Sequence, residues 1–190
     1  MRGDIASGRS AHAYLFAGPA GTGKRSLADL CARAWNCLGR DAPCGVCAHC
    51  ARSLGGNDPD LMVIEPEKSI GVDDVRALTE WLSTRPGDAG RRVAIVRGAD
   101  RMTVPAQNAL LKTLESPPGD AVIVLIAESA AALLPTVVSR CRIMRFSPLD
   151  AGDAARALIA RGIAPDRAAL LSRLAMGSVG RALQIDQSED

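Results

Sequence analysis

Four of the six cysteines in the chain lie close together, as Cys37, Cys44, Cys47 and Cys50. Four thiolates at this spacing can surround one Zn²⁺ ion tetrahedrally, and a site closed by four protein ligands leaves no position for water or substrate. We therefore expect a structural zinc module over about residues 37–50, which stabilises a loop with little apolar core of its own. Cysteines that end a helix and line a loop by chance are the alternative. We leave His49 out of the ligand set.

A glycine-rich loop that ends in lysine is the second group that could do chemistry. It reads GPAGTGK over residues 18–24, directly after an apolar strand pattern and before a helix pattern. In such a loop the backbone N–H groups and the helix N-terminus bind phosphates, and the lysine reaches the β- and γ-phosphates. The candidate nucleotide-binding residues are Gly18, Gly21, Gly23, Lys24 and Arg25. A glycine-rich turn that binds no ligand is the alternative.

The Mg²⁺ side of this loop departs from the working pattern at three positions. Arg25 follows the lysine, where a serine or threonine hydroxyl would coordinate Mg²⁺. At the end of a neighbouring strand pattern, Arg97 and Gly98 stand where a metal-binding acid and a glutamate that polarises water are expected. Asp100, in the turn that follows, is better placed to cap or ion-pair the next segment. The sequence thus predicts a degraded site that does not hydrolyse ATP efficiently, and it leaves open whether ATP and Mg²⁺ bind.

The elements that must position these residues alternate along the first part of the chain. Short apolar runs predict strands at 13–17, 61–64, 92–97, 121–127 and 143–146. Helical patterns between them cover about 23–38, 72–82 and 104–115, with a shorter one near 130–138. Continuously apolar strands that alternate with helices predict an α/β fold, in which a parallel sheet is covered on both faces. Three further helical patterns follow at 151–161, 166–175 and 178–184.

Composition excludes several classes of protein. The 190 residues are 47% hydrophobic, which favours a folded chain, and they contain no apolar run of the roughly 20 residues that span a bilayer. A net charge of +2 is too small for a protein that coats nucleic acid. The N-terminus lacks the pattern of a secretory signal, so we expect a cytoplasmic protein without membrane contact. In that reducing compartment the cysteines are better suited to metal than to disulfides.

Several further motifs carry a resemblance to a known family. They are HAYLF at 12–16, DPD at 58–60, VDDVR at 72–76, NALLKTLESPP at 108–118 and SRC at 139–141. Together with the phosphate loop and the four cysteines, they resemble the AAA+ clamp-loader subunits of bacterial DNA polymerase III. The apolar positions of the 108–115 segment also fit plain helix packing, which is compatible with the family reading.

The resemblance implies a fold and a division into domains. We expect an AAA+ P-loop domain with a five-stranded parallel sheet over 1–148, with the cysteine module as an insertion. A small lid of three helices would cover 149–190. In the lid motif GSVGR, Arg181 stands one residue beyond the usual sensor arginine. From the comparison with the family, we expect the chain to begin inside the first helix and to lack the collar domain.

The resemblance also implies a function. Family members form a pentameric arc that opens a sliding clamp and places it on primed DNA, as part of a DNA-directed DNA polymerase holoenzyme. ATP sits between neighbouring subunits, and the arginine of the SRC motif, here Arg140, would project as a trans arginine finger into the site of an adjacent gamma/tau subunit. The delta subunit, the clamp and primer-template DNA would be the other partners. A surface or ion-paired arginine is the alternative for Arg140.

The altered loop separates two branches of the family. Delta prime subunits have a degraded ATP site and keep the SRC motif, whereas gamma/tau subunits have the intact hydroxyl and acids. Arg25, Arg97 and Gly98 therefore favour the delta prime branch. An active AAA+ ATPase of the gamma/tau type is the alternative, whereas a P-loop kinase of small molecules has no support from the NALLK and SRC motifs.

Overall fold

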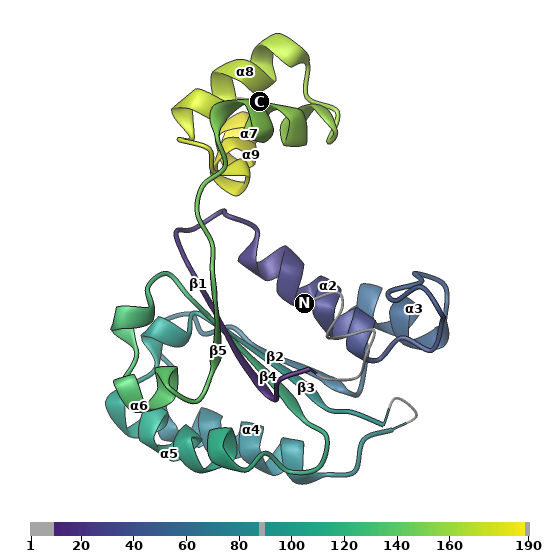
Figure 1. Ribbon diagram of the computed structural model, residues 1–190, viewed down its shortest axis with the longest axis vertical. Helices are drawn as coiled ribbons and strands as arrows, with labels where there is room; N and C mark the ends of the chain where they lie inside the picture. Colours follow the sequence, from purple (N-terminus) through teal and green to yellow (C-terminus); the bar gives the residue numbers. More distant parts are fainter. Residues whose placement is uncertain (1–9, 88–89, 189–190) are drawn as a thin grey trace.

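A five-stranded parallel sheet forms the centre of the computed structural model, which describes residues 10–87 and 90–188 (Figure 1). The strands are β1 (Ala13–Ala17), β2 (Leu61–Ile64), β3 (Val93–Arg97), β4 (Val122–Ala127) and β5 (Arg142–Arg145). Their order across the sheet is β2-β3-β4-β1-β5. All four neighbouring pairs are parallel, with Leu15 of β1 opposite Leu125 of β4. The predicted strands and the parallel sheet are confirmed.

Helices cover both faces of the sheet because successive strand residues point to opposite faces and both sets are apolar. Tyr14 and Phe16 pack with Ala28 and Ala32 of α2 (Lys24–Trp35). Leu15 faces the other way, into the larger cluster with α4 (Val72–Ser83) and α5 (Val104–Glu115). Figure 1 shows α2 on one face and α4, α5 and α6 (Pro135–Val138) on the other.

The predicted helix at 130–138 is wrong as a single element. The segment forms a short 3₁₀ turn, η2 (Ala130–Ala132), and then the separate helix α6. Leu133 and Leu134 between them have extended backbone, with ψ angles of 153° and 138°. Pro135 explains the break, because proline disfavours helical geometry in the residue before it. A second 3₁₀ turn, η1 (Ala99–Arg101), follows β3.

The cysteine segment contains a helix that the sequence patterns did not predict. Helix α2 ends at Trp35 rather than near 38, and α3 (Ala48–Leu54) follows the loop that carries the first cysteines. Cys47 caps α3, since its sulfur accepts a hydrogen bond from the backbone N–H of Cys50 at 3.5 Å. A helix this short has no apolar periodicity to read, and its start depends on a thiol instead of an ordinary capping residue.

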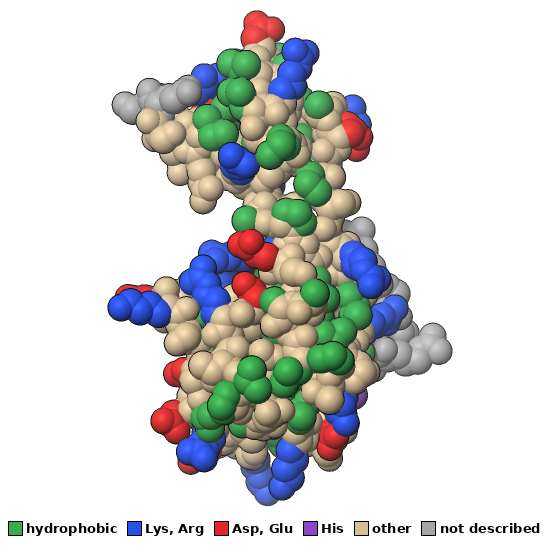
Figure 2. All heavy atoms as spheres, turned by 90° about the vertical axis from the view of Figure 1, so that its left-hand side faces the viewer, with side chains coloured by type: hydrophobic (Ala, Val, Ile, Leu, Met, Phe, Trp, Pro, Cys, Tyr) green, Lys and Arg blue, Asp and Glu red, His purple; other side chains and the backbone are tan. Residues whose placement is uncertain are grey.

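Three C-terminal helices pack around a core of their own. They are α7 (Ala151–Ile159), α8 (Pro165–Leu174) and α9 (Val179–Ser188). Leu158, Ala168, Leu171, Ala175 and Ala182 form that core. Figure 2 shows this helical unit meeting the sheet unit at a narrow waist. The expected start inside a first helix concerns residues 1–9, which lie outside the described ranges.

None of the helices in the described ranges combines the length and the apolar character that crossing a membrane requires.

Candidate functional site

The phosphate loop lies between β1 and α2, at the carboxyl edge of the sheet. Gly21 and Gly23 have φ angles of 73° and 88°, in the left-handed region that favours glycine. At Gly18 a β-carbon would overlap the backbone carbonyl oxygen of Phe146, which follows β5. The predicted strand–loop–helix context of the motif is therefore present, and its glycines are required by backbone geometry and close packing.

The lysine of this loop is folded back onto the loop itself. The Nζ atom of Lys24 donates hydrogen bonds to the carbonyl oxygen of Pro19, at 2.6 Å, and to that of Gly18. The residue is only 6% exposed. Burial lowers the pKa of Lys24, and the nearby carboxylates of Glu128 and Asp100 partly oppose that shift. The ammonium group that would contact a phosphate is thus engaged by backbone carbonyls.

Ion pairs occupy the edge where the metal-binding acids were expected. The guanidinium of Arg97 donates to Asp29 of α2, at 3.0 Å, and to Glu65, at 2.8 Å. Glu65 also pairs with Arg25 at 2.6 Å. The hydrogen bond from Arg97 lowers the pKa of Glu65, so its carboxylate stays charged. Arg25, which follows the phosphate loop, and Arg97, at the end of β3, therefore share the carboxylate of Glu65.

Neither Asp29 nor Glu65 was identified from the sequence. Glu65 directly follows β2, and the end of a strand at this edge was the signal that could have found it. Asp100 accepts a hydrogen bond from the backbone N–H of Glu128 at 3.3 Å, so it bridges two turns at this edge. Gly98 adopts a φ of 69° and begins the turn that carries Asp100.

The start of α9 packs directly against the phosphate loop. The backbone N–H of Gly180 donates to the carbonyl oxygen of Gly21 at 3.0 Å, and the hydroxyl of Ser178 donates to the carbonyl oxygen of Ala20 at 3.1 Å. A β-carbon at position 180 would lie 2.7 Å from the α-carbon of Gly21, which is too close for a side chain. The exposed Arg181 follows this contact. Nothing in the sequence pattern indicated the pairing of these two segments.

Arg140 lies in the turn between α6 and β5. Its Nε atom donates to Glu115 at 2.9 Å, its second terminal nitrogen also contacts that carboxylate, and its first donates to the carbonyl oxygen of Thr136 at 2.8 Å. Its side chain is 32% exposed. The described structure thus places the candidate finger at the surface and ion-paired.

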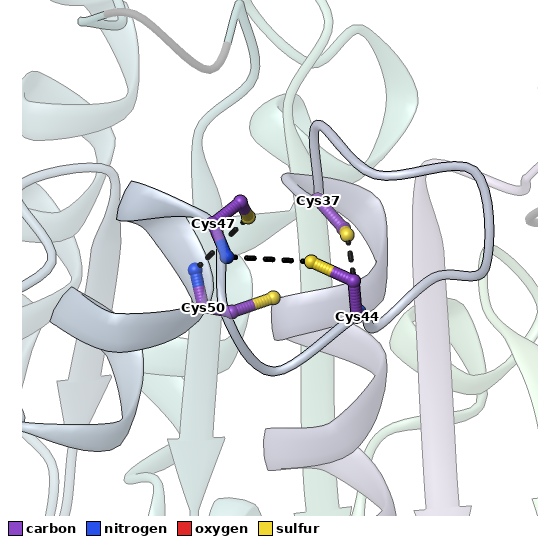
Figure 3. A group of neighbouring side chains, drawn as sticks. All are labelled: Cys37, Cys44, Cys47 and Cys50. Carbon is purple, nitrogen blue, oxygen red and sulfur yellow. Dashed lines mark hydrogen bonds between the residues drawn. The ribbon is translucent and has the colours of Figure 1, made fainter.

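The four cysteines converge from the end of α2, the following loop and the start of α3 (Figure 3). Their sulfur atoms all lie within 4.8 Å of one another. A tetrahedral site with Zn–S distances of about 2.3 Å needs its sulfurs about 3.8 Å apart. His49 belongs to a second candidate group, with Asp58 and Asp60. The donor set therefore fits a metal ion with four thiolate ligands.

Backbone N–H groups around this cluster favour charged sulfur. The N–H groups of Gly39 and Cys44 both donate to the sulfur of Cys37 at 3.3 Å, and that of Cys47 donates to the sulfur of Cys44 at 3.4 Å. The backbone N–H of Cys50 is the largest of the causes that lower the pKa of Cys47 to about 6. Burial raises the pKa of Cys50 to about 12, so a thiolate there needs a nearby cation.

A buried polar cluster connects this cysteine module to the sheet. His49 of α3 lies 3.8 Å from Asp58, and Asp60 accepts a hydrogen bond from the backbone N–H of Gly87 at 2.8 Å. Arg92 lies 3.5 Å from Asp60 and places its guanidinium 4.6 Å above the ring of Trp81. His49, Asp58 and Asp60 could themselves hold an ion. Arg92 already supplies positive charge to Asp60.

Comparisons with known proteins agree with this architecture. The family model described as "DNA polymerase III, delta subunit" matches residues 1–150. The chain belongs to this family. It is 37% identical to DNA polymerase III subunit delta' of Bacillus subtilis, over 98% of this chain and 57% of that protein. It is 41% identical to the subunit delta' of Pseudomonas aeruginosa, over 91% of this chain and 54% of that protein.

Subunits of the gamma/tau branch are also similar to this chain. DNA polymerase III subunit gamma/tau of Mycobacterium bovis is 40% identical over 82% of this chain and 27% of that protein. The chain thus spans about half the length of the delta' relatives and about a quarter of this gamma/tau relative.

Solved structures share the fold. A gamma subunit-related protein of Thermotoga maritima superposes with a TM-score of 0.58 at 26% identity, over 80% of this chain and 47% of that one. The RuvB Holliday junction branch migration motor of the same organism gives a TM-score of 0.63 at 16% identity, over 98% of this chain and 56% of that one. The second likeness concerns the fold alone.

Proposed function

We propose that the chain is a subunit of the bacterial DNA polymerase III clamp loader that does not turn over ATP at its own site. In this role it assists ATP-driven loading of the sliding clamp onto primed DNA, together with gamma/tau and delta subunits. Residues 1–148 act as the AAA+ domain and residues 149–190 as its lid. Contact with the clamp and with DNA is made through the assembled complex, since the net charge of +2 gives no strong basic surface.

The ion pairs at the edge of the sheet carry the proposal of an idle ATP site. Glu65 contacts both Arg25 and Arg97, so arginine already neutralises this acid near the phosphate loop. Lys24 is bonded to carbonyl oxygens of its own loop. Arg25 stands where the hydroxyl that coordinates Mg²⁺ would be, and Arg25 and Arg97 engage the carboxylate of Glu65, which weakens the charge stabilisation that phosphoryl transfer requires.

We further propose that Arg140 acts in trans on the ATP bound by an adjacent gamma/tau subunit. Its surface position and its place in the SRC motif support this role. A guanidinium supplied by a neighbour stabilises the charge that develops on the γ-phosphate, an effect worth about 10³ to 10⁵ in rate.

A reconstituted complex of the full-length subunit with gamma/tau, delta, clamp and primed DNA tests this role. Arg140→Ala should reduce DNA-stimulated ATP hydrolysis and clamp loading. Arg142→Ala, which changes an exposed arginine two residues away, is the matched control and should have little effect. Unchanged ATPase and loading with Arg140→Ala, in a complex that assembles normally, would show that the arginine is not a finger.

An active ATPase of the gamma/tau type is the second candidate. It is favoured by the complete glycine-lysine motif of the loop and by the 40% identity to a gamma/tau subunit. Purified protein that turns over ATP alone, with the turnover lost in Lys24→Ala, would establish this candidate. Absence of turnover at saturating ATP and Mg²⁺ favours the idle site.

We propose that the ion held by the four cysteines is Zn²⁺ with a structural role. The thiolate donor set and its closed geometry favour zinc, which then fastens the loop after α2 to the start of α3. Elemental analysis of protein purified without chelator should give one zinc per chain. Less than about half an equivalent would exclude a resident zinc ion.

A further inference from the structure

The ion pair of Arg140 joins two elements that are distant in the chain. Glu115 is the last residue of α5, 25 positions before Arg140. One carboxylate oxygen of Glu115 accepts from two nitrogens of the guanidinium, so the contact fixes the plane of that group as well as its distance. The remaining terminal nitrogen donates to the carbonyl oxygen of Thr136 in α6. The side chain is therefore held from two directions.

The guanidinium of Arg140 keeps N–H donors that contacts within its own chain do not use. An arginine side chain carries five N–H bonds in a fixed plane. Glu115 uses two of them and the Thr136 carbonyl uses one. Two N–H bonds, one on each terminal nitrogen, stay available for a ligand, apart from a marginal contact with the Ser139 hydroxyl at 3.5 Å. Both available donors lie on terminal nitrogens, which suits an oxyanion from another molecule.

The elements that hold the arginine are themselves fixed. Leu110 and Leu114 of α5 are fully buried against the sheet, and Val137 of α6 is buried in the same cluster. Glu115 therefore projects from a helix end that cannot move independently of the core. A flexible arginine with many rotamers would have to be ordered each time a neighbour's nucleotide arrived, and that ordering costs conformational entropy.

We propose that Glu115 is a positioning residue that pre-orients Arg140 for the nucleotide of the adjacent subunit. This inference rests on the proposed finger role of Arg140. The carboxylate acts through the arginine and does not itself touch the nucleotide. Exposed ion pairs contribute little to folding stability, so the consequence of this pair is expected in the ATPase of the complex and not in the stability of the chain.

The test compares Glu115→Ala, Glu115→Gln, Arg140→Ala and the Glu115→Ala/Arg140→Ala double variant in the reconstituted clamp loader. Glu115→Ala should lower kcat for DNA-stimulated ATP hydrolysis about tenfold, which corresponds to about 1.4 kcal/mol, while the KM for ATP stays unchanged. Glu115→Gln keeps an acceptor oxygen without the charge and should fall between Glu115→Ala and the unaltered chain. In the Arg140→Ala background, removing Glu115 should have no further effect.

Asp120→Ala is the matched control. Asp120 accepts from two nitrogens of Arg91, at 2.9 and 2.6 Å, so its exposed carboxylate forms a pair of the same type elsewhere on the sheet unit. Asp120→Ala should leave kcat unchanged. Thermal unfolding should show that Asp120→Ala and Glu115→Ala both stay folded.

Three outcomes would overturn the inference. An unchanged or increased kcat in Glu115→Ala would mean that the pair does not orient the arginine productively. An equal loss in the presence and absence of Arg140 would indicate that Glu115 acts by another route. If Arg140→Ala leaves kcat unchanged, the proposed finger role is wrong and the positioning role is wrong with it. If Arg140→Ala lowers kcat and Glu115→Ala does not, only the positioning role is wrong.

Discussion

The contact between the phosphate loop and α9 gives a prediction that two glycines of one loop can test. Gly21 and Gly23 both have left-handed backbone, with φ angles of 73° and 88°. Their surroundings differ, because a β-carbon at position 21 would overlap the Ser178 hydroxyl and lie 2.9 Å from the Arg181 nitrogen, whereas one at position 23 meets nothing within 4 Å. Gly21→Ala should therefore release α9 from the loop, and Gly23→Ala should not.

The surroundings of the two glycines set the expected difference in free energy between Gly21→Ala and Gly23→Ala. Alanine in left-handed geometry costs about 1–2 kcal/mol at either position. At position 21 the steric conflict also breaks the Gly180–Gly21 and Ser178–Ala20 hydrogen bonds, worth about 0.5–1.5 kcal/mol each. The difference between the two variants is thus about 1–3 kcal/mol and reports the docking contact alone.

Hydrogen–deuterium exchange is the assay for this difference, because it measures local opening of individual amides. The Gly180 amide donates to the Gly21 carbonyl oxygen, and 1–3 kcal/mol corresponds to about a 5- to 150-fold loss of its protection. Gly21→Ala should show that loss, while Gly23→Ala keeps the protection of the unaltered chain. Equal protection of Gly180 in the two variants would refute the docking argument, because only one of them disturbs the contact.

Three other predictions concern the metal, the acid dependence and the core. Cys47→Ser should abolish stoichiometric metal binding measured by elemental analysis, whereas Cys31→Ala, at a buried thiol outside the cluster, should retain it. The pKa of Glu65 is lowered in the folded chain, so its charged carboxylate contributes to stability above its usual pKa near 4.5. This contribution is lost as the pH falls below that value. The Glu65→Gln variant should therefore lose less unfolding free energy in acid than the unaltered chain. Leu110→Ala should cost about 2–5 kcal/mol in chemical denaturation because Leu110 is fully buried, and Leu111→Ala, at a partly buried position, should cost less.

The sheet and the chemical groups could be predicted because their signals are local. Apolar runs such as that of β4 mark buried strands directly, and the spacing of Cys44 and Cys47 suggests a metal ligand set without knowledge of the fold. Helix α3 was missed because it is seven residues long and begins at a cysteine that also belongs to the metal cluster. Its formation depends on the thiol and backbone geometry of the cluster, which leave no helical periodicity to detect.

The partners of the functional residues could not be predicted, because they come from distant parts of the chain. Arg97 and Asp29 are 68 positions apart, and Ser178 and Ala20 are 158 apart. Each pairing follows from how helices dock onto the sheet, which depends on packing of the whole molecule. The sequence indicated that Arg97 replaces an acid, and only the fold identifies which carboxylates neutralise it.

We propose that Arg140 acts on the ATP of a neighbouring subunit, whereas this chain's own phosphate loop does not turn over ATP. The DNA-stimulated ATPase rate of the complete reconstituted clamp loader tests both parts of this proposal. The rate is measured with either Lys24→Ala or Arg140→Ala in this subunit. The proposed function predicts an unchanged rate with Lys24→Ala and a large loss with Arg140→Ala, because a finger is worth about 10³-fold or more at the site it serves. A large loss with Lys24→Ala and none with Arg140→Ala would contradict it.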